Sequence, residues 1–334
     1  MLFSELAAPF LAPDALHIPD GFLSAAVAVA MWIVTAAFIA VAVRRASREF
    51  DDRLAPLMGV LAAFIFAAQA FNFPVAGGTS GHFLGGALAA ILLGPWAALL
   101  VMSAVIGLQA LVFQDGGLLA MGANIFVMGI VTVWVGYFVY QALTRFNRFL
   151  AAFAAGWLSV LVAAVVTAFL LAFSGTASLN VVLTAMATIH AVIGLGEGLI
   201  TAGAVALVAA ALPGRFDQQV AARKTDRGTW VAGGVVLALL IGVTAVFFAS
   251  PHPDGLERVA EDTGFLHTAQ APLFNIAPDY VVPGLSNESL AGVLAVVLGI
   301  LLLFAVGYGI ARALSRRSHR QAEGARPEPA GKGS

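Results

Sequence analysis

The sequence predicts an all-α protein that crosses a membrane many times. Of its 334 residues, 60% are hydrophobic and only 10% are charged, whereas a soluble domain carries about 25% charged residues. The charged residues lie almost wholly between long apolar runs, and about 20 apolar residues are enough to cross the hydrocarbon core of a bilayer. We therefore predict a polytopic membrane protein with about nine transmembrane helices, and the composition excludes a soluble protein.

Eight apolar segments account for the nine helices. The segment 83–113 is broken by Gly94-Pro95, and because proline cannot continue a helix, we expect a short helix of about a dozen residues, a tight turn and then a longer helix. The other seven segments are 22–43, 54–73, 118–143, 150–173, 180–212, 229–249 and 290–313.

The distribution of basic residues predicts the orientation of the chain. Lysine and arginine accumulate on the cytoplasmic side of a membrane. With the N-terminus outside, nine helices place all of the 17 basic residues except Arg258 in inner segments. Merging 83–113 into one span would break this pattern. We expect a protein of the cell membrane with its N-terminus outside and its C-terminus in the cytoplasm.

The composition also divides the chain into units. A basic linker, 215–228, separates a seven-helix unit (16–214) from a two-helix unit (229–314). The external loop of the second unit, 250–289, is acidic and contains several prolines. The tail 315–334 is polar and contains proline, so we expect disordered cytoplasmic chain there.

The residues that indicate a functional site are histidines. The chain has no cysteine, which excludes disulfides, thiolate metal sites and thiol catalysis. It has no GxxxxGK[ST] motif that would bind ATP and no HExxH motif. His17 stands just before the first span, and His82 follows the glycine-rich segment 74–81. Non-helical backbone at membrane depth is tolerated only where it is buried in protein or lines a cavity.

Two motifs carry a resemblance to a known family. HIPDGFL at 17–23, followed by GGTSGH at 77–82 and Gly94-Pro95-Trp96, resembles the nickel and cobalt substrate-capture subunits of energy-coupling-factor transporters, the CbiM/NikM family. PDGLER at 253–258 resembles the small companion subunit of those systems, the PDGLE or CbiN/NikN type, here fused in one chain. The resemblance covers residues 16 to 315.

The resemblance implies a metal site made of nitrogen atoms. In that family the metal is held by the amine of the first residue, by the amide nitrogen and imidazole of a histidine at position two, and by a second histidine from the glycine-rich loop. These roles fall here on Leu16, His17 and His82. The amine, the amide and the first imidazole form two fused chelate rings in one plane, and square-planar nitrogen donors suit Ni(II), with Cu(II) as its competitor.

The first 15 residues depart from the family pattern. Leu16 can offer an amine only if the mature chain begins there. Residues 1–15 lack a basic beginning, and Pro9 and Pro13 interrupt their apolar stretch, so they make a poor signal peptide. We expect translation to begin at Leu16, read as methionine; cleavage after Ala15 is the alternative.

Further polar residues are expected to support the site. His190 and Glu197 are seven residues apart in a helical run, which puts them on one face; they form either a buried structural pair or a supporting or gating group. Asp20 is a carboxylate three residues after His17. Four more residues are expected to orient the His82 loop or to bond its imidazole, although packing between helices would also explain Asn124; they are Asn72, Thr79, Ser80 and Asn124.

The function that follows is capture of Ni(II), or alternatively Co(II), for an importer. The resemblance implies a non-catalytic subunit without a cofactor, embedded in the lipid bilayer, whose partners are a transmembrane coupling subunit and ATP-hydrolysing subunits, with no role for nucleic acid. A self-sufficient secondary transporter would carry acidic residues in several spans, but Glu197 is the only clear one. A membrane metalloenzyme would need a general base beside the metal, and only Asp20 is near. We expect the loop 250–289 to aid loading or coupling; whether it supplies ligands stays open.

Overall fold

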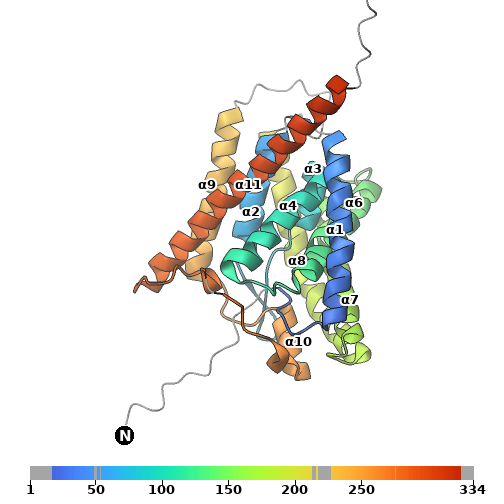
Figure 1. Cartoon of the computed structure of the whole chain (residues 1–334), viewed down its shortest axis with the longest axis vertical. Helices are drawn as coiled ribbons and strands as arrows, with labels where there is room; N and C mark the ends of the chain where they lie inside the picture. The colour runs from blue at the N-terminus through green and yellow to red at the C-terminus, as the bar shows by residue number, and fades with distance from the viewer. Residues whose placement is uncertain are drawn as a thin grey trace, which may run out of the picture.

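The protein is a bundle of α-helices, seen here in a computed structural model (Figure 1). The structure describes residues 17–48, 51–52, 54–212, 216, 227–274 and 276–324. Seven helical segments in this part of the chain are long and apolar enough to cross a membrane, which confirms the all-α membrane fold. They are α1 (Ala25–Arg48), α4 (Pro95–Leu108) with the π-helical turn Gln109–Phe113, α5 (Met121–Asn124) and α6 (Thr132–Leu143) with the π-helical turn Ile125–Val131 between them, α7 (Arg148–Phe173), α8 (Leu179–Ala211), α9 (Arg227–Phe248) and α11 (Glu288–Gly324).

The two other apolar helices are short. Helix α2 (Leu54–Gln69) has 16 residues and α3 (Gly86–Leu93) has 8, so at 1.5 Å per residue neither spans the bilayer alone. Gly94 separates α3 from α4 at a φ of 79°, and Pro95 begins α4, as the sequence predicts. The nine expected helical segments are thus all found, but two of them are too short to span.

Extended chain connects these two short helices. Strands β1 (Phe73–Val75) and β2 (Thr79–Gly81) form an antiparallel hairpin in which Phe73 pairs with Gly81. Residues 82–85 then run to the start of α3 without regular structure. Non-helical backbone therefore enters the bundle between α2 and α3.

The C-terminal helices pack on α2. Helix α11 lies along α2, and α9 contacts both. Two glycines of α11 allow this approach, because a Cβ atom on Gly299 would meet the Phe66 ring at 2.4 Å and one on Gly307 would meet the Met58 carbonyl at 2.8 Å. Small residues at helix contacts serve the same purpose in membrane bundles generally.

The connection between α9 and α11 folds back over one end of the bundle. It contains α10 (Gly255–Thr263) and the 3₁₀ turns Leu266–Thr268 and Pro278–Tyr280. Helix α10 contacts α8 and β2 and lies at the bottom of Figure 1, whereas α11 ends at the top. We call the end that carries α10 the site end, because the candidate ligands lie there.

Two expected boundaries differ. Helix α11 continues to Gly324, so residues 315–324, expected to be disordered, are helical; residues 325–334 lie outside the described part. Helix α9 begins at Arg227, two residues before the expected start of the second unit at position 229. Residues 1–16, with the extension and Leu16, and most of the linker are also outside the described residues.

Candidate metal site

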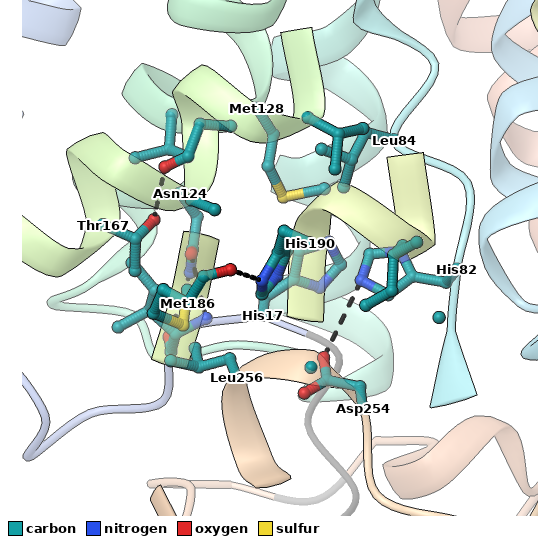
Figure 2. A pocket seen from close by; sticks show the side chains of 18 residues that line it. His17, His82, Leu84, Asn124, Met128, Thr167, Met186, His190, Asp254 and Leu256 are labelled. Carbon is teal, nitrogen blue, oxygen red and sulfur yellow. Dashed lines mark hydrogen bonds and ion pairs between the residues drawn. The ribbon is translucent and has the colours of Figure 1, made fainter. Parts of the chain in front are cut away.

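His17 and His82 lie together at the site end of the bundle. Their ring centroids are 5.8 Å apart, with 61° between the ring planes, and the two residues are 2% and 8% exposed. Both line a cavity of about 70 Å³ together with His190, Asn124 and Asp254 (Figure 2). Since about 10–15 Å³ of cavity volume on this measure is enough for one water molecule, the cavity has room for an ion and several water molecules.

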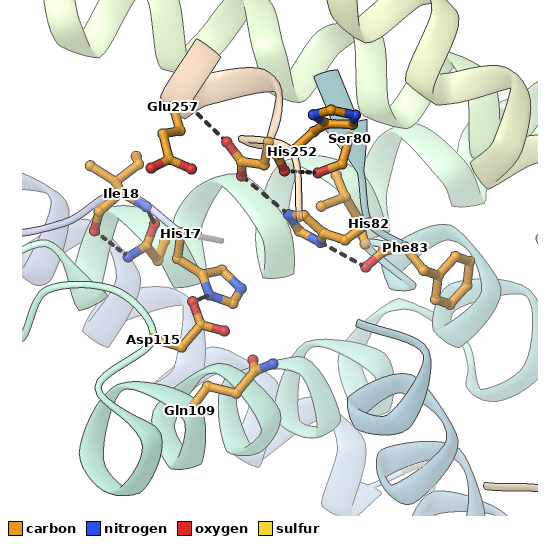
Figure 3. Close-up of polar contacts among 12 residues, drawn as sticks. His17, Ile18, Ser80, His82, Phe83, Gln109, Asp115, His252 and Glu257 are labelled. Atoms are coloured by element: carbon orange, nitrogen blue, oxygen red, sulfur yellow. Dashed lines mark hydrogen bonds and ion pairs between the residues drawn. The ribbon is translucent and has the colours of Figure 1, made fainter. Parts of the chain in front are cut away.

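A chain of hydrogen bonds holds the His17 ring. Its Nδ1 donates to Asp115 Oδ1 at 2.6 Å (Figure 3), and Tyr280 of the C-terminal unit donates its hydroxyl hydrogen to Asp115 Oδ2 at 2.5 Å. Gln109 in turn donates to the Tyr280 oxygen at 3.2 Å. The His17 Nε2 atom is buried and has no hydrogen-bond partner among the described residues. With the proton on Nδ1, the lone pair of Nε2 is available.

Asp115 is a charged centre that the sequence analysis missed. Burial alone would raise the pKa of Asp115, but His17 and the Tyr280 hydroxyl hold it below its usual value. Gln114 and Tyr280, which flank this carboxylate, are the only non-glycine residues of the described chain with positive φ, 57° and 59°. Backbone strain of this kind collects at functional sites.

The backbone around Asp115 depends on a glycine. A Cβ atom on Gly116 would lie 2.8 Å from the His17 Cβ, and its φ is 91°. The Asp115-Gly116-Gly117 sequence was therefore the one signal that this loop approaches another segment closely.

The backbone groups of the segment that carries His82 form hydrogen bonds with side chains from two helices. His82 Nδ1 donates to the Phe83 carbonyl at 3.2 Å. Glu197 of α8 accepts the N–H groups of Leu84 and Gly85 at 2.6 and 2.9 Å, and Gln69 of α2 donates to the Leu84 carbonyl at 2.8 Å. Irregular backbone inside a bundle needs such partners. Glu197 thus supports the His82 segment.

His190 lines the cavity, but its Nδ1 is bonded to the backbone of its own helix. It donates to the Met186 carbonyl one turn earlier in α8, at 2.9 Å. His190 and Glu197 share the inner face of α8, as their spacing predicts, yet the structure records no bond between them. Glu197 binds the backbone after His82, whereas His190 lines the cavity.

Asp20 and Asn124 hold the loop of His17. Asp20 accepts the N–H groups of Leu118 and Ala120 at 3.0 and 2.9 Å. Asn124 accepts the Ile18 N–H and donates to the Ile18 carbonyl, both at 3.0 Å. Asn124 was expected either to orient the His82 loop or to serve packing between helices, and in the structure its amide bonds the backbone beside His17.

The hairpin residues bind the C-terminal unit. The Ser80 N–H donates to the Pro253 carbonyl and its hydroxyl to the His252 carbonyl, both at 2.8 Å. The Asn72 carbonyl accepts the Ser250 N–H at 2.8 Å, and Thr79 is buried in β2 opposite Val75. For these residues no described bond reaches the His82 ring, so their contribution is to attach the loop after α9.

Asp254 brings an acidic side chain to His82. It caps α10, with Oδ1 accepting the Glu257 N–H at 2.7 Å, and its Oδ2 lies 3.8 Å from His82 Nε2. Burial raises the pKa of Asp254 to about 7. Gly255 makes the approach feasible, because a Cβ there would lie 2.8 Å from His190 Cε1 and 2.7 Å from Ile193 Cδ1. The sequence analysis identified the motif that contains Asp254, but it did not predict that Asp254 lies beside His82.

The described cavity is lined by the imidazoles of His17, His82 and His190 and by the Asp254 carboxylate. Within the described residues no group of three or more histidine, cysteine, aspartate or glutamate side chains is arranged to hold a metal ion. Leu16, whose amine is part of the expected ligand set, lies outside them.

Comparisons with known families and proteins agree with this architecture. Residues 17–214 match the family model of the CbiM cobalt uptake substrate-specific transmembrane region, and residues 228–316 match the PDGLE domain. A putative fused nickel transport protein NikMN of Archaeoglobus fulgidus is 40% identical over 302 residues, which cover 89% of this chain and 98% of the relative. The fused nickel transport protein NikMN of Rhodobacter capsulatus is 31% identical, over 91% of this chain and 100% of its own.

A solved structure shares the fold of the first unit. A crystal structure of a truncated transition metal transporter is 35% identical and matches with a TM-score of 0.53, over 57% of this chain and 97% of its own. With both units matched in order and relatives covered over nearly their whole length, this chain belongs to the CbiM family, in the form fused to a PDGLE domain.

Proposed function

We propose that this protein captures Ni(II), with Co(II) as the alternative substrate, for an energy-coupling-factor importer. The observation that carries the proposal is the buried pair of His17 and His82, whose Nδ1 atoms both donate hydrogen bonds and whose rings share one cavity. Relatives of both units are named nickel transport proteins, and a shorter relative from Acetoanaerobium sticklandii is named a cobalt transport protein. Imidazole nitrogen suits both metals.

The proposed site is square-planar, with the Leu16 amine, the His17 amide and imidazole, and His82 as its four nitrogen donors. A chelate that includes the His17 amide must close through Nδ1, because Nε2 points away from the residue's own backbone. In the structure, Nδ1 is bonded to Asp115. Loading would therefore exchange this hydrogen bond for a metal bond: Nδ1 gives up its proton, Nε2 takes up the ring proton, and the terminal ammonium and the His17 amide release one proton each to solvent.

The direction of transport follows from the proposed orientation. With the site end outside, the metal binds from the external side, and ATP is hydrolysed by partner subunits that act through a transmembrane coupling subunit. The absence of a GxxxxGK[ST] motif from this chain supports a separate ATPase.

Uptake of radioactive nickel by cells tests this function. We expect ATP-dependent uptake only when the genes of the coupling and ATPase subunits are expressed with this chain. Uptake by this chain alone would instead establish a secondary transporter.

Replacement of His82 tests the site. His82→Ala removes one nitrogen donor, so nickel affinity should fall about a hundredfold or more, since even loss of a residue behind a ligand costs 10- to 100-fold. His319→Ala is the matched control, because His319 is exposed and contacts Asp52 far from the site. Calorimetry on the purified proteins measures both affinities, and wild-type nickel binding by His82→Ala would contradict the assignment.

The start of the mature chain is a separate test. The terminal-amine chelate requires a chain that begins at position 16, and mass spectrometry of the natively expressed protein reads this directly. An active, nickel-loaded chain that still begins at Met1 would exclude the chelate.

A further inference from the structure

Asp254 is a buried acid with a second oxygen turned to the metal cavity. Only 4% of the residue is exposed, and it lines the cavity with His17 and His82 (Figure 2). Oδ1 caps α10 through the Glu257 N–H, whereas Oδ2 faces His82 Nε2. A helix cap needs one oxygen acceptor. The cap, which also includes a hydrogen bond from the Leu256 N–H, does not by itself require Oδ2 to be turned toward His82.

The separation between Oδ2 and His82 suits a bridging metal ion. It is 3.8 Å, too long for a hydrogen bond. First-row divalent ions such as zinc bind imidazole nitrogen and carboxylate oxygen at about 2.0–2.2 Å each, so one ion can touch two such atoms up to about 4.2 Å apart. No backbone movement is required for one ion to contact both.

The charge balance of the cavity also favours a cation. His82 is the only basic side chain that the described residues place within ion-pair range of Asp254. A buried carboxylate without a full positive partner is costly, and a divalent ion would supply that charge. The buried His17 ring lines the same cavity, so a cation held between Asp254 and His82 would lie beside the third candidate ligand.

We propose that Asp254 is a metal ligand of the loading step, and that its Oδ2 and His82 Nε2 together take the incoming Ni(II) or Co(II) before His17 binds it. This inference rests on the proposed function. It gives the fused C-terminal unit a direct chemical part, since the acid comes from the loop after α9, which is attached to the hairpin through Ser80. The ion loses part of its water shell to this oxygen and nitrogen pair, and His17 then leaves Asp115 to complete the site.

Two variants separate this role from helix capping. Asp254→Asn and Asp254→Ser both keep an oxygen acceptor for the Glu257 N–H, and both residues are good caps. Neither carries a charge at neutral pH. Thermal unfolding of the metal-free proteins should therefore stay near that of the wild type, which shows that α10 is still in place.

A third variant controls for long-range attraction. Removing a negative charge near the mouth of a site slows the association of a cation by weakening the surrounding field. Asp262→Asn makes the same chemical change on α10, but Asp262 is exposed and pairs with Arg258. It reports the effect of the field alone.

The measurement is the association rate of Ni(II) with the purified full chain, followed by stopped-flow competition with a nickel-binding dye. We expect a fall of about tenfold or more in Asp254→Asn and Asp254→Ser, as for other residues that act on a metal, and a rate near wild type in Asp262→Asn. Wild-type rates in both Asp254 variants, or an equal fall in Asp262→Asn, would overturn the inference while wild-type nickel binding upholds the proposed function. A wild-type protein that binds no nickel overturns both.

Discussion

At the scale of single residues, a carboxylate fixes the backbone at each of the two candidate ligands, His17 and His82. In each case one carboxylate accepts two backbone N–H groups: Asp20 binds the loop that packs on His17, and Glu197 binds the segment after His82. A carboxylate can accept several hydrogen bonds at once and donates none when ionised. It is therefore suited to fix a short irregular segment that has no neighbouring strand.

Glu197→Gln is predicted to loosen the His82 segment. The glutamine oxygen can accept one of the two N–H groups, but its own NH₂ group then faces the other and leaves it unsatisfied. An unsatisfied buried donor costs about 1–3 kcal/mol, so we expect a lower unfolding temperature and weaker nickel binding. Glu261→Gln on α10 is the control, because Glu261 is exposed and its pair with Arg258 is worth little. Unchanged stability and affinity in Glu197→Gln would rule out this supporting role.

Individual residues were predictable only where the chain marked them locally. His17 and His82 stood out because each lies beside glycine- or proline-containing backbone next to a span. Asp115 and Asp254 did not, because their importance comes from contacts with residues far away in the sequence. A single sequence shows that such an acid exists, but packing decides what it meets.

At the scale of elements, α10 was the helix that the sequence analysis left as loop. Its signals were present: Asp254 as a cap with Glu257 three residues later, and buried Leu256, Val259 and Ala260 at helical spacing. They were overlooked because nine residues in a polar loop look unlike the long apolar runs around them. Hydropathy finds the elements that face lipid, and α10 faces protein.

Gly255→Ala is predicted to lift α10 from α8. The added methyl group would overlap the His190 ring and Ile193, and overpacking of this kind costs about 1–3 kcal/mol. Gly233→Ala is a matched control, since a Cβ at that position of α9 meets nothing within 4 Å and alanine favours helix. We expect a lower unfolding temperature for the first variant and an equal or higher one for the second. Equal stability of both would show that α10 tolerates displacement.

At the scale of the whole molecule, two units with separate family matches meet at the site end of the bundle. The PDGLE unit packs on α2 and also covers the cavity, with Asp254 and Tyr280 reaching residues of the first unit. The order of the apolar segments and the fusion could be read from hydropathy and motifs, because each depends on local sequence, but α10 was missed and two of the nine expected spans, α2 and α3, are too short to cross the bilayer. The way the second unit closes over the first could not, since it depends on contacts across the linker.

A chain that ends near Arg227 tests this division of labour. It keeps His17 and His82, so we expect it to retain equilibrium nickel binding but to load slowly and transport poorly. Expression of residues 227–334 as a separate polypeptide should restore the rate, because α9 and α11 contact α2 through an apolar surface. Complete loss of equilibrium binding in the shortened chain would instead show that the C-terminal unit holds the metal in its final state.

The shortness of α3 has an electrical consequence. Its 8 residues rise only about 12 Å, so if α3 ends at the inner surface of the membrane, the segment that begins with His82 lies inside the roughly 30 Å thickness of the hydrocarbon core. With the site end outside, a doubly charged ion that binds there has already crossed part of the membrane voltage. If that part is about a quarter of 100 mV, the ion gains about 1 kcal/mol, or about sevenfold in affinity. Nickel binding in vesicles should therefore tighten when a potassium gradient makes the interior negative, before any ATP is hydrolysed.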